Sequence, residues 1–240
     1  MSTSYNPKVV TDGLVQYFDA SNPKSFVSGS RITTDLISTT RTGSLVAGVT
    51  GSYTTTGEFT FNNTGYISAN TIVTNVSNWT LAAWVKPAAA NASSTFISNG
   101  RQGVNTGSGF ALMQNIGSSS DENPDPGLIG GNRFTILYCD RRWVGALNTP
   151  ELVIGGWQYL VASCAASVVT AYFNGVRYGS YTGTSPVAPV TTDNITFGAQ
   201  QTQNIRYLSG SLGPIQIYNR GLSAAEIQQN FNATRGRFGV

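Results

Sequence analysis

Residues 210–240 read GSLGPIQIYNRGLSAAEIQQNFNATRGRFGV, and this stretch predicts a strand, a turn and one capped helix. Ile215 and Ile217 alternate with Gln and Tyr, which is the two-residue period of a half-buried strand. The Asn-Arg-Gly that follows ends the strand. Ser223 and Glu226 then have the spacing of a capping box, in which the hydroxyl and the carboxylate each accept a hydrogen bond from a backbone N–H. A helix this short is not stable by itself, so we expect it to dock on the rest of the chain.

The apolar side chains of this segment indicate how it docks. Leu222 precedes the helix, and Ile227 and Phe231 lie four residues apart on one helical face. We expect these three side chains to close the protein beside its first strand. The polar, basic residues 232–240 are then left without a role in the core. We expect these residues to form a tail with an exposed phenylalanine. In this tail, Arg235, Arg237 and Phe238 are the residues expected to contact a partner.

The chain before residue 210 is predicted to be β-structure almost throughout. Asn174-Gly175, between two apolar runs, is typical of a type I′ hairpin because both turn residues need positive φ. Residues 57–67 predict one strand, or two around a turn. The other apolar runs, separated by turns that contain Gly or Pro, are residues 14–19, 79–86, 95–98, 110–114, 134–139, 157–163, 168–173 and 195–198.

The pattern predicts the fold class and the domain organisation. Many short strands with a single terminal helix indicate an all-β fold, a two-sheet antiparallel jelly-roll sandwich with one short C-terminal helix. No linker and no internal repeat interrupts the pattern. We therefore expect a single domain over residues 1–240, with an N-terminal arm at 1–12 and a C-terminal tail at 232–240.

Composition excludes several classes of function. Only 10% of the 240 residues are charged, against about a quarter in ordinary proteins. No run of Lys and Arg is long enough for a nucleic-acid partner. The polar N-terminal residues carry no apolar signal region, and no segment predicts a membrane span, so we expect a protein made in the cytosol without a membrane partner. A surface rich in Ser, Thr, Asn, Gln and Gly is typical of extracellular β proteins and virion shells, and equally of Thr-rich β proteins in general.

The residues available for catalysis are few. The chain has no histidine, which excludes Ser-His-Asp and Cys-His nucleophiles and histidine-ligated metals. Glycoside hydrolysis needs two carboxylates about 5–10 Å apart, whereas Asp19, Glu58, Asp140 and Glu151 are isolated in the sequence. No glycine-rich cofactor loop is present. We expect a protein that is not an enzyme and has no cofactor.

One loop concentrates acidic side chains. Residues 117–132 contain Asp121, Glu122 and Asp125, and carboxylates on a loop are suitable ligands for Ca²⁺. Their spacing does not fit an EF-hand, and two prolines stiffen the loop, so a solvated loop is the favoured interpretation and a calcium site the alternative.

The two cysteines leave two alternatives open. Cys139 and Cys164 both lie in apolar, strand-like runs, and their spacing does not indicate a metal site. Two buried free thiols are the main interpretation, and a disulfide between neighbouring strands is the other.

Four motifs together resemble those of laminin-G-like, concanavalin A-like jelly rolls. They are GLVQYFDA at 13–20, LAAWVKP at 81–87, WQYLVA at 157–162 followed by FNG at 173–175, and GSLGPIQIYNRGLS at 210–223. The resemblance extends from residue 13 to residue 231 and implies two packed antiparallel sheets, one of them concave. Many relatives bind sugars there, and others bind only proteins. The Glu-x-Asp-x-x-Glu run of glucanases with this fold is absent from the chain.

The end of the chain has a narrower resemblance. Residues 227–240, IQQNFNATRGRFGV, resemble the ends of structural proteins from tailed, cyanophage-like bacteriophages. This resemblance implies a non-enzymatic virion structural protein located in the virion, as a capsid decoration, neck, tail or fibre component. Its partners would be other virion proteins, in an oligomeric arrangement, and host surface polysaccharide. The alternative is a carbohydrate-binding adhesion module that is not built into a virion.

The resemblance to sugar-binding relatives directs attention to aromatic residues outside the strand motifs. Sugar rings stack on aromatic side chains while their hydroxyls pair with amides. Trp79, Trp84 and Trp157 lie in strand motifs, where we expect core positions. The expected carbohydrate-binding residues are therefore Trp143 beside Arg141, and Tyr207 near Asn204.

Overall fold

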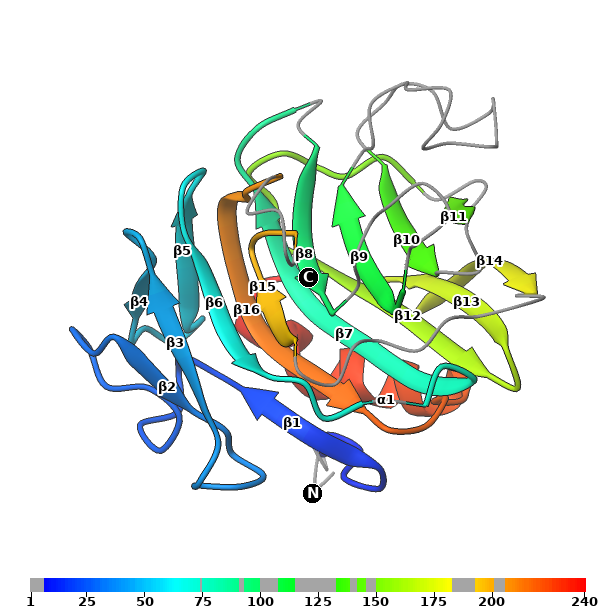
Figure 1. Cartoon of the computed structure of the whole chain (residues 1–240), viewed down its shortest axis with the longest axis horizontal. Helices are drawn as coiled ribbons and strands as arrows, with labels where there is room; N and C mark the ends of the chain where they lie inside the picture. The colour runs from blue at the N-terminus through cyan, green and yellow to red at the C-terminus, as the bar shows by residue number, and fades with distance from the viewer. Residues whose placement is uncertain are drawn as a thin grey trace, which may run out of the picture.

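Sixteen strands, antiparallel in every pairing, form two packed sheets in the part of the chain that the computed structural model describes. The described residues are 7–73, 75–90, 93–99, 108–114, 133–138, 142–145, 150–182, 193–200 and 206–240. Figure 1 shows the two sheets face to face, with one helix behind the sheet that contains β7 and β16. The predicted all-β sandwich with one short C-terminal helix is confirmed.

The first sheet, sheet A, has two long strands at its centre. Nearly every residue of β7 and β16 is buried, because sheet B covers one face of sheet A and the helix covers the other. The order across the sheet is β14 (Val176–Thr182), β13 (Val168–Phe173), β12 (Gln158–Ala165), β7 (Asn78–Pro87), β16 (Ser209–Tyr218), β5 (Glu58–Asn62) and β4 (Thr50–Ser52), and β1 (Leu14–Phe18) also pairs with β16.

The second sheet, sheet B, has one face in the core and the other turned outward. In β3 the buried residues alternate with exposed ones, as in a strand covered on one side. The order across the sheet is β11 (Arg142–Gly145), β10 (Phe134–Tyr138), β9 (Phe110–Gln114), β8 (Ser94–Ser98), β15 (Asn194–Phe197), β6 (Tyr66–Asn70), β3 (Thr42–Val46) and β2 (Ile32–Thr34).

The closing strand β16 has two different neighbours along one edge. Its first half, from Ser209 to Leu212, pairs with β5, and its second half pairs with β1. The register against β7 shifts between Leu212 and Ile215, where Pro214 has no N–H to donate to the ladder. The strand predicted from the alternation of Ile215 and Ile217 is therefore confirmed, with an irregularity at its middle.

Aromatic side chains fill the space between the sheets. Trp79 is fully buried there and stacks on Phe110, with ring centroids 4.2 Å apart. Cys164 is buried, with its Sγ 3.5 Å from the Ser77 carbonyl oxygen, and Cys139 lies outside the described residues. The type I′ turn is confirmed, since φ is 49° at Asn174 and 81° at Gly175.

The helix α1 (Ala224–Thr234) covers the outer face of sheet A. Its capping box is formed as predicted: the Ser223 hydroxyl accepts from the Glu226 N–H at 3.3 Å, and the Glu226 carboxylate accepts from the Ser223 N–H at 2.8 Å. Leu222, Ile227 and Phe231 are buried, beside Leu14 of the first strand, as expected. They close the outer face of sheet A and not the space between the sheets. No helix in the described part of the chain has the length and apolar character to cross a membrane.

The expectation of a C-terminal tail without a role in the core is wrong. Phe238 is only 8% exposed, and its ring lies 4.3 Å from that of Trp84 and 4.8 Å from that of Trp157. The Trp84 side chain lies on the face of sheet A that is turned away from sheet B. It is therefore covered by α1 together with the segment that contains the 3₁₀ turn η2 (Arg235–Arg237) and Phe238. The sequence alone placed Trp84 in a core without indicating which segment completes that core.

Candidate functional site

The residues predicted to bind carbohydrate are not brought together in the described part of the chain. Trp143 lies in β11, the edge strand of sheet B, and its backbone pairs with Leu137. Tyr207 is half-buried just before β16 of sheet A. Arg141 and Asn204 lie outside the described residues, as do the three carboxylates of the predicted calcium alternative, Asp121, Glu122 and Asp125.

A row of uncharged side chains crosses the outer face of sheet B. Leu45 and Ile67 of β3 and β6 belong to the core between the sheets, so their strand neighbours Ser44 and Ser68 point to the opposite face. The register continues this row from strand to strand through Ile32, Ser44, Ser68, Thr196, Ser98 and Ala111, and reaches the backbone of Trp143 by way of Leu137.

The row changes from exposed to buried along its length. Ile32 is 51% exposed, whereas Thr196 is 6% exposed and Ser98 is fully buried. The Thr196 hydroxyl is 2.8 Å from the Ala199 carbonyl, to which it donates. The accessible part of the row therefore lies over β2, β3 and β6 and ends at β15.

Among the described residues, the accessible part of this face has no charged side chain. We call it the hydroxyl face and define it by the residues that share one side of β2, β3, β6 and β15. Asn194 donates from its amide to the Ser68 hydroxyl at 2.8 Å. The members are Ile32, Thr34, Thr42, Ser44, Val46, Tyr66, Ser68, Asn70, Asn194 and Thr196.

Sequence reasoning missed the hydroxyl face because its strands carry weak β signals. The segment Thr42–Val46 reads TGSLV and contains a glycine, and β2 has three residues. The usable signal was the alternation of Ser or Thr with Leu or Ile, which marks a half-buried strand whose outer side is uncharged.

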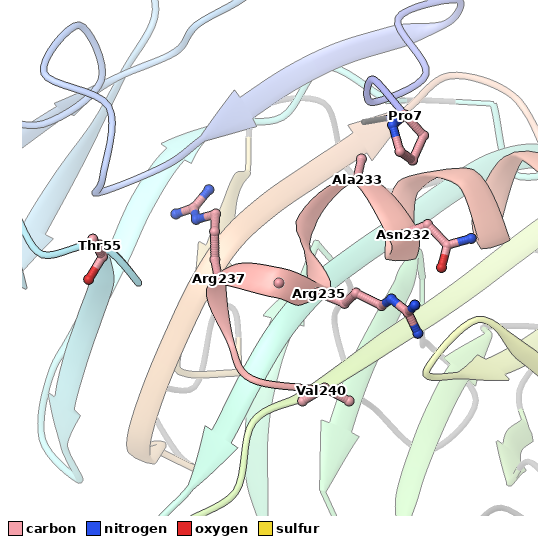
Figure 2. A pocket seen from close by; sticks show the side chains of 8 residues that line it. Pro7, Thr55, Asn232, Ala233, Arg235, Arg237 and Val240 are labelled. Atoms are coloured by element: carbon pink, nitrogen blue, oxygen red, sulfur yellow. The ribbon is translucent and has the colours of Figure 1, made fainter. Parts of the chain in front are cut away.

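A second surface lies on the other side of the sandwich, over sheet A. Figure 2 shows a hollow around the C-terminal turn, bordered by three segments that are far apart in the sequence. Its lining residues are Pro7, Thr55, Asn232, Ala233, Arg235, Gly236, Arg237 and Val240. Two of the three expected partner contacts, Arg235 and Arg237, therefore line it, and the third, Phe238, packs beneath the turn.

The two arginines of this hollow have different roles. Arg237 donates to both carboxylate oxygens of Asp19, at 2.8 and 2.9 Å, and to the carbonyl of Thr56 at 2.7 Å. Burial opposes the charge of Arg237, but its hydrogen bonds and its attraction to Asp19 outweigh burial and raise its pKa. Arg235 is exposed, with its guanidinium 5.7 Å from the Phe231 ring. The side chains of Arg235 and Arg237 point in different directions (Figure 2).

The carboxylates of the described residues are mostly engaged by cations. Five of them lie within ion-pair distance of Lys or Arg: Asp12 and Glu226 with Arg220, Asp19 with Arg237, Asp35 with Arg41, and Glu58 with Lys86. The described residues contain no group of three or more Cys, Asp or Glu side chains suited to a metal ion. Asp140 lies outside the described residues.

Several solved structures share this fold. Domain 4 of AbnA, an extracellular GH43 arabinanase from Geobacillus stearothermophilus solved with arabinotriose, has a TM-score of 0.66 at 13% identity, over 90% of this chain and 97% of that one. A Trypanosoma rangeli sialidase with sialic acid has a TM-score of 0.63 at 15% identity, over 98% of this chain and 36% of that one. The botulinum neurotoxin serotype D binding domain has a TM-score of 0.61 at 14% identity, over 92% and 51%.

Identities this low show a shared fold and nothing more, and the chain spans about a third of the sialidase and half of the toxin domain. No curated protein sequence matches the chain. A family model, described as the concanavalin A-like lectin/glucanases superfamily, matches residues 61–228. That match covers more than half of the sequence, and the chain therefore belongs to the concanavalin A-like lectin/glucanases superfamily.

Proposed function

We propose that this chain is a non-enzymatic recognition domain whose hydroxyl face binds carbohydrate. The observation that carries the proposal is an accessible, uncharged sheet face of Ser, Thr and Asn side chains with one aromatic residue, Tyr66. Hydroxyl and amide groups pair with sugar hydroxyls, and an aromatic ring packs against sugar C–H groups. The fold of the arabinanase domain solved with arabinotriose is consistent with this use of the sandwich.

The absence of catalysis is part of the proposal. It is supported by the ion pairs that hold Asp19, Asp35, Glu58 and Glu226, since carboxylates held by cations of the fold are not presented to a substrate as a catalytic pair. Incubation with polysaccharides, followed by measurement of released reducing ends, tests it. The proposal would be contradicted if the protein released reducing ends faster than a buffer control and if Glu151→Gln or Asp140→Asn abolished this activity.

We further propose that the domain is a structural component of a tailed-phage virion, made in the host cytoplasm and docked on other virion proteins. The resemblance of residues 227–240 to phage proteins supports this role, as does the 10% content of charged residues. The hollow beside Arg235 offers a docking place on sheet A, which leaves the hydroxyl face of sheet B accessible. The same particle could then hold the domain in an oligomeric array and present its sugar-binding side outward.

Separate experiments test the two parts. Mass spectrometry of purified virions should detect the chain at a structural copy number, and its absence from particles would reject the virion role. A glycan array that includes host surface polysaccharide should show binding to the isolated domain. Glycan binding without incorporation into particles would favour the alternative, a free adhesion module.

A further inference from the structure

We infer that the hydroxyl face selects uncharged glycans, and that a neutral sugar chain lies across β2, β3, β6 and β15 with Ser44 at the centre of its site. This inference rests on the proposed carbohydrate recognition and adds the ligand class and the position of the site. It follows from three properties of the face: its members carry no charge, its polar side chains are short and lose little entropy on binding, and the strand register places them in rows.

The first observation is the absence of charge over ten outward positions. The charged residues next to these strands are Arg31, Asp35, Arg41 and Asp193. They lie outside the strand bounds and are not members of the face. Arg41 is also held by the Asp35 carboxylate at 2.9 Å and the Val15 carbonyl at 2.7 Å. A sulfated or carboxylated sugar therefore has no cation on the face to offset the loss of its hydration. A neutral sugar exchanges hydrogen bonds with water for hydrogen bonds with hydroxyls and amides.

The second observation is that the polar side chains are short. Ser, Thr and Asn have few rotatable bonds, so fixing them against a ligand costs less conformational entropy than fixing Lys, Glu or Arg. Their positions are set by the strand pairs Ser44–Ser68, Ser68–Thr196 and Asn70–Asn194. The hydrogen bond from Asn194 to Ser68 fixes one amide further. The face is therefore preorganised for hydrogen bonding.

The spacing of the strands sets the direction in which a sugar chain would lie on the face. Adjacent strands are about 4.8 Å apart, which is close to the length of one sugar ring, so a chain that crosses the strands meets a new outward side chain of the face at each sugar. Ile32, Val46 and Tyr66 add apolar surface on the same side. The site ends at β15, because Thr196 is buried and its hydroxyl is already hydrogen-bonded within the protein.

The test uses the whole chain and pairs of polysaccharides that differ in charge. Arabinan, galactan and dextran are the neutral probes, and dextran sulfate and alginate the anionic ones. Binding is measured by isothermal titration at high salt, which screens the non-specific attraction of anions to a protein of net charge +3. We expect at least one neutral probe to bind, and the anionic probes to bind at least tenfold more weakly.

Two matched variants locate the site. Ser44 is the central, exposed residue of β3 on sheet B, and Thr60 is the central, exposed residue of β5 on sheet A. Ser44→Arg should weaken the binding of the neutral probe at least tenfold, whereas Thr60→Arg should leave it unchanged. Asn194→Ala, which removes an exposed amide without adding bulk, should weaken binding about threefold to tenfold. Unchanged thermal melting curves show that each variant is folded.

The outcomes separate this inference from the function on which it rests. If a neutral polysaccharide binds, and Ser44→Arg abolishes this binding while Thr60→Arg retains it, the result supports both the site on the hydroxyl face and carbohydrate recognition. Glycan binding that both Ser44→Arg and Asn194→Ala leave intact, or binding to the anionic probes alone, overturns the site and the ligand class but leaves carbohydrate recognition standing. If no probe binds, carbohydrate recognition itself is rejected, and this inference with it.

Discussion

The guanidinium of Arg237 holds the carboxylate of Asp19 through two hydrogen bonds, 2.8 and 2.9 Å long, between residues 218 positions apart in the chain. Arg237 also donates to the Ser21 hydroxyl at 2.6 Å and the Thr56 carbonyl at 2.7 Å. The contact fastens the C-terminal turn to the segments that follow β1 and β4. It explains why Arg237, near the end of this chain, belongs to the fold.

Replacement of Arg237 should destabilise the protein. Arg237→Ala leaves Asp19, which is 5% exposed, with an unpaired charge. Breaking a fully buried ion pair costs about 3–5 kcal/mol; we expect about 2–3 kcal/mol here, because the Arg237 side chain is 26% exposed. Urea denaturation measures the change. Arg235→Ala is the matched control, with an expected loss below about 1 kcal/mol; equal losses in both variants would contradict the assigned contact.

Removal of the Phe238 ring should loosen the outer layer of sheet A. Phe238 packs against Trp84 and Trp157, so Phe238→Ala should cost about 3 kcal/mol, the lower end for a buried phenylalanine. Near-UV circular dichroism and tryptophan fluorescence should change with it. Deletion of residues 235–240 should have a larger effect. A truncated protein with the melting temperature of the full chain would restore the interpretation of these residues as a dispensable tail.

Acid should weaken the start of α1 through Glu226. The hydrogen bond from Arg220 lowers the pKa of Glu226 from its ordinary value of 4.5 to about 2, and the cap at Ser223 adds to this effect. A carboxyl group with a lowered pKa in the folded state stabilises the protein above pH 4.5, and this stabilisation is lost as the pH falls from about 4.5 towards 2. Urea midpoints at pH 7 and pH 3 should therefore differ less in Glu226→Gln than in the wild type. An identical pH dependence in both would argue against this role of the pair.

Alanine at Gly57 should be costlier than alanine at another glycine of similar conformation. Gly57 and Gly29 both have positive φ, 59° and 82°, which costs about 1 kcal/mol for a non-glycine residue. A Cβ at Gly57 would meet the backbone nitrogen of Ser21, whereas a Cβ at Gly29 meets nothing within 4 Å. Gly57→Ala should therefore lose clearly more stability than Gly29→Ala in thermal denaturation, and equal losses would show that the Ser21 segment gives way freely.

The sequence predicted best those elements whose signals are local. The capping box at Ser223 and Glu226 involves residues three apart, and the turn at Asn174-Gly175 involves neighbours, so both were visible without tertiary information. The strands β2, β3, β4 and β11 were missed, because they are short or lack apolar alternation. The hairpin signal at Asn174-Gly175 indicated that a strand follows Gly175, but not how far this strand, β14, extends. In β14 the segment Val176–Thr182 is largely exposed, and a strand with little buried surface leaves little pattern to detect.

The sequence by itself determined the all-β class, the closing strand and helix, and the family, because alternation, capping and turn chemistry act between residues close in the chain. Only the tertiary structure decided where the outward residues of sheet B meet and which partner Arg237 has. Strand register brought Ser44, Ser68 and Thr196 into one row from segments far apart, and no local pattern specifies that pairing. The same reason explains the end of the chain: residues 235–237 look like a solvated basic turn until the fold places Asp19 beside Arg237 and Trp84 beneath Phe238.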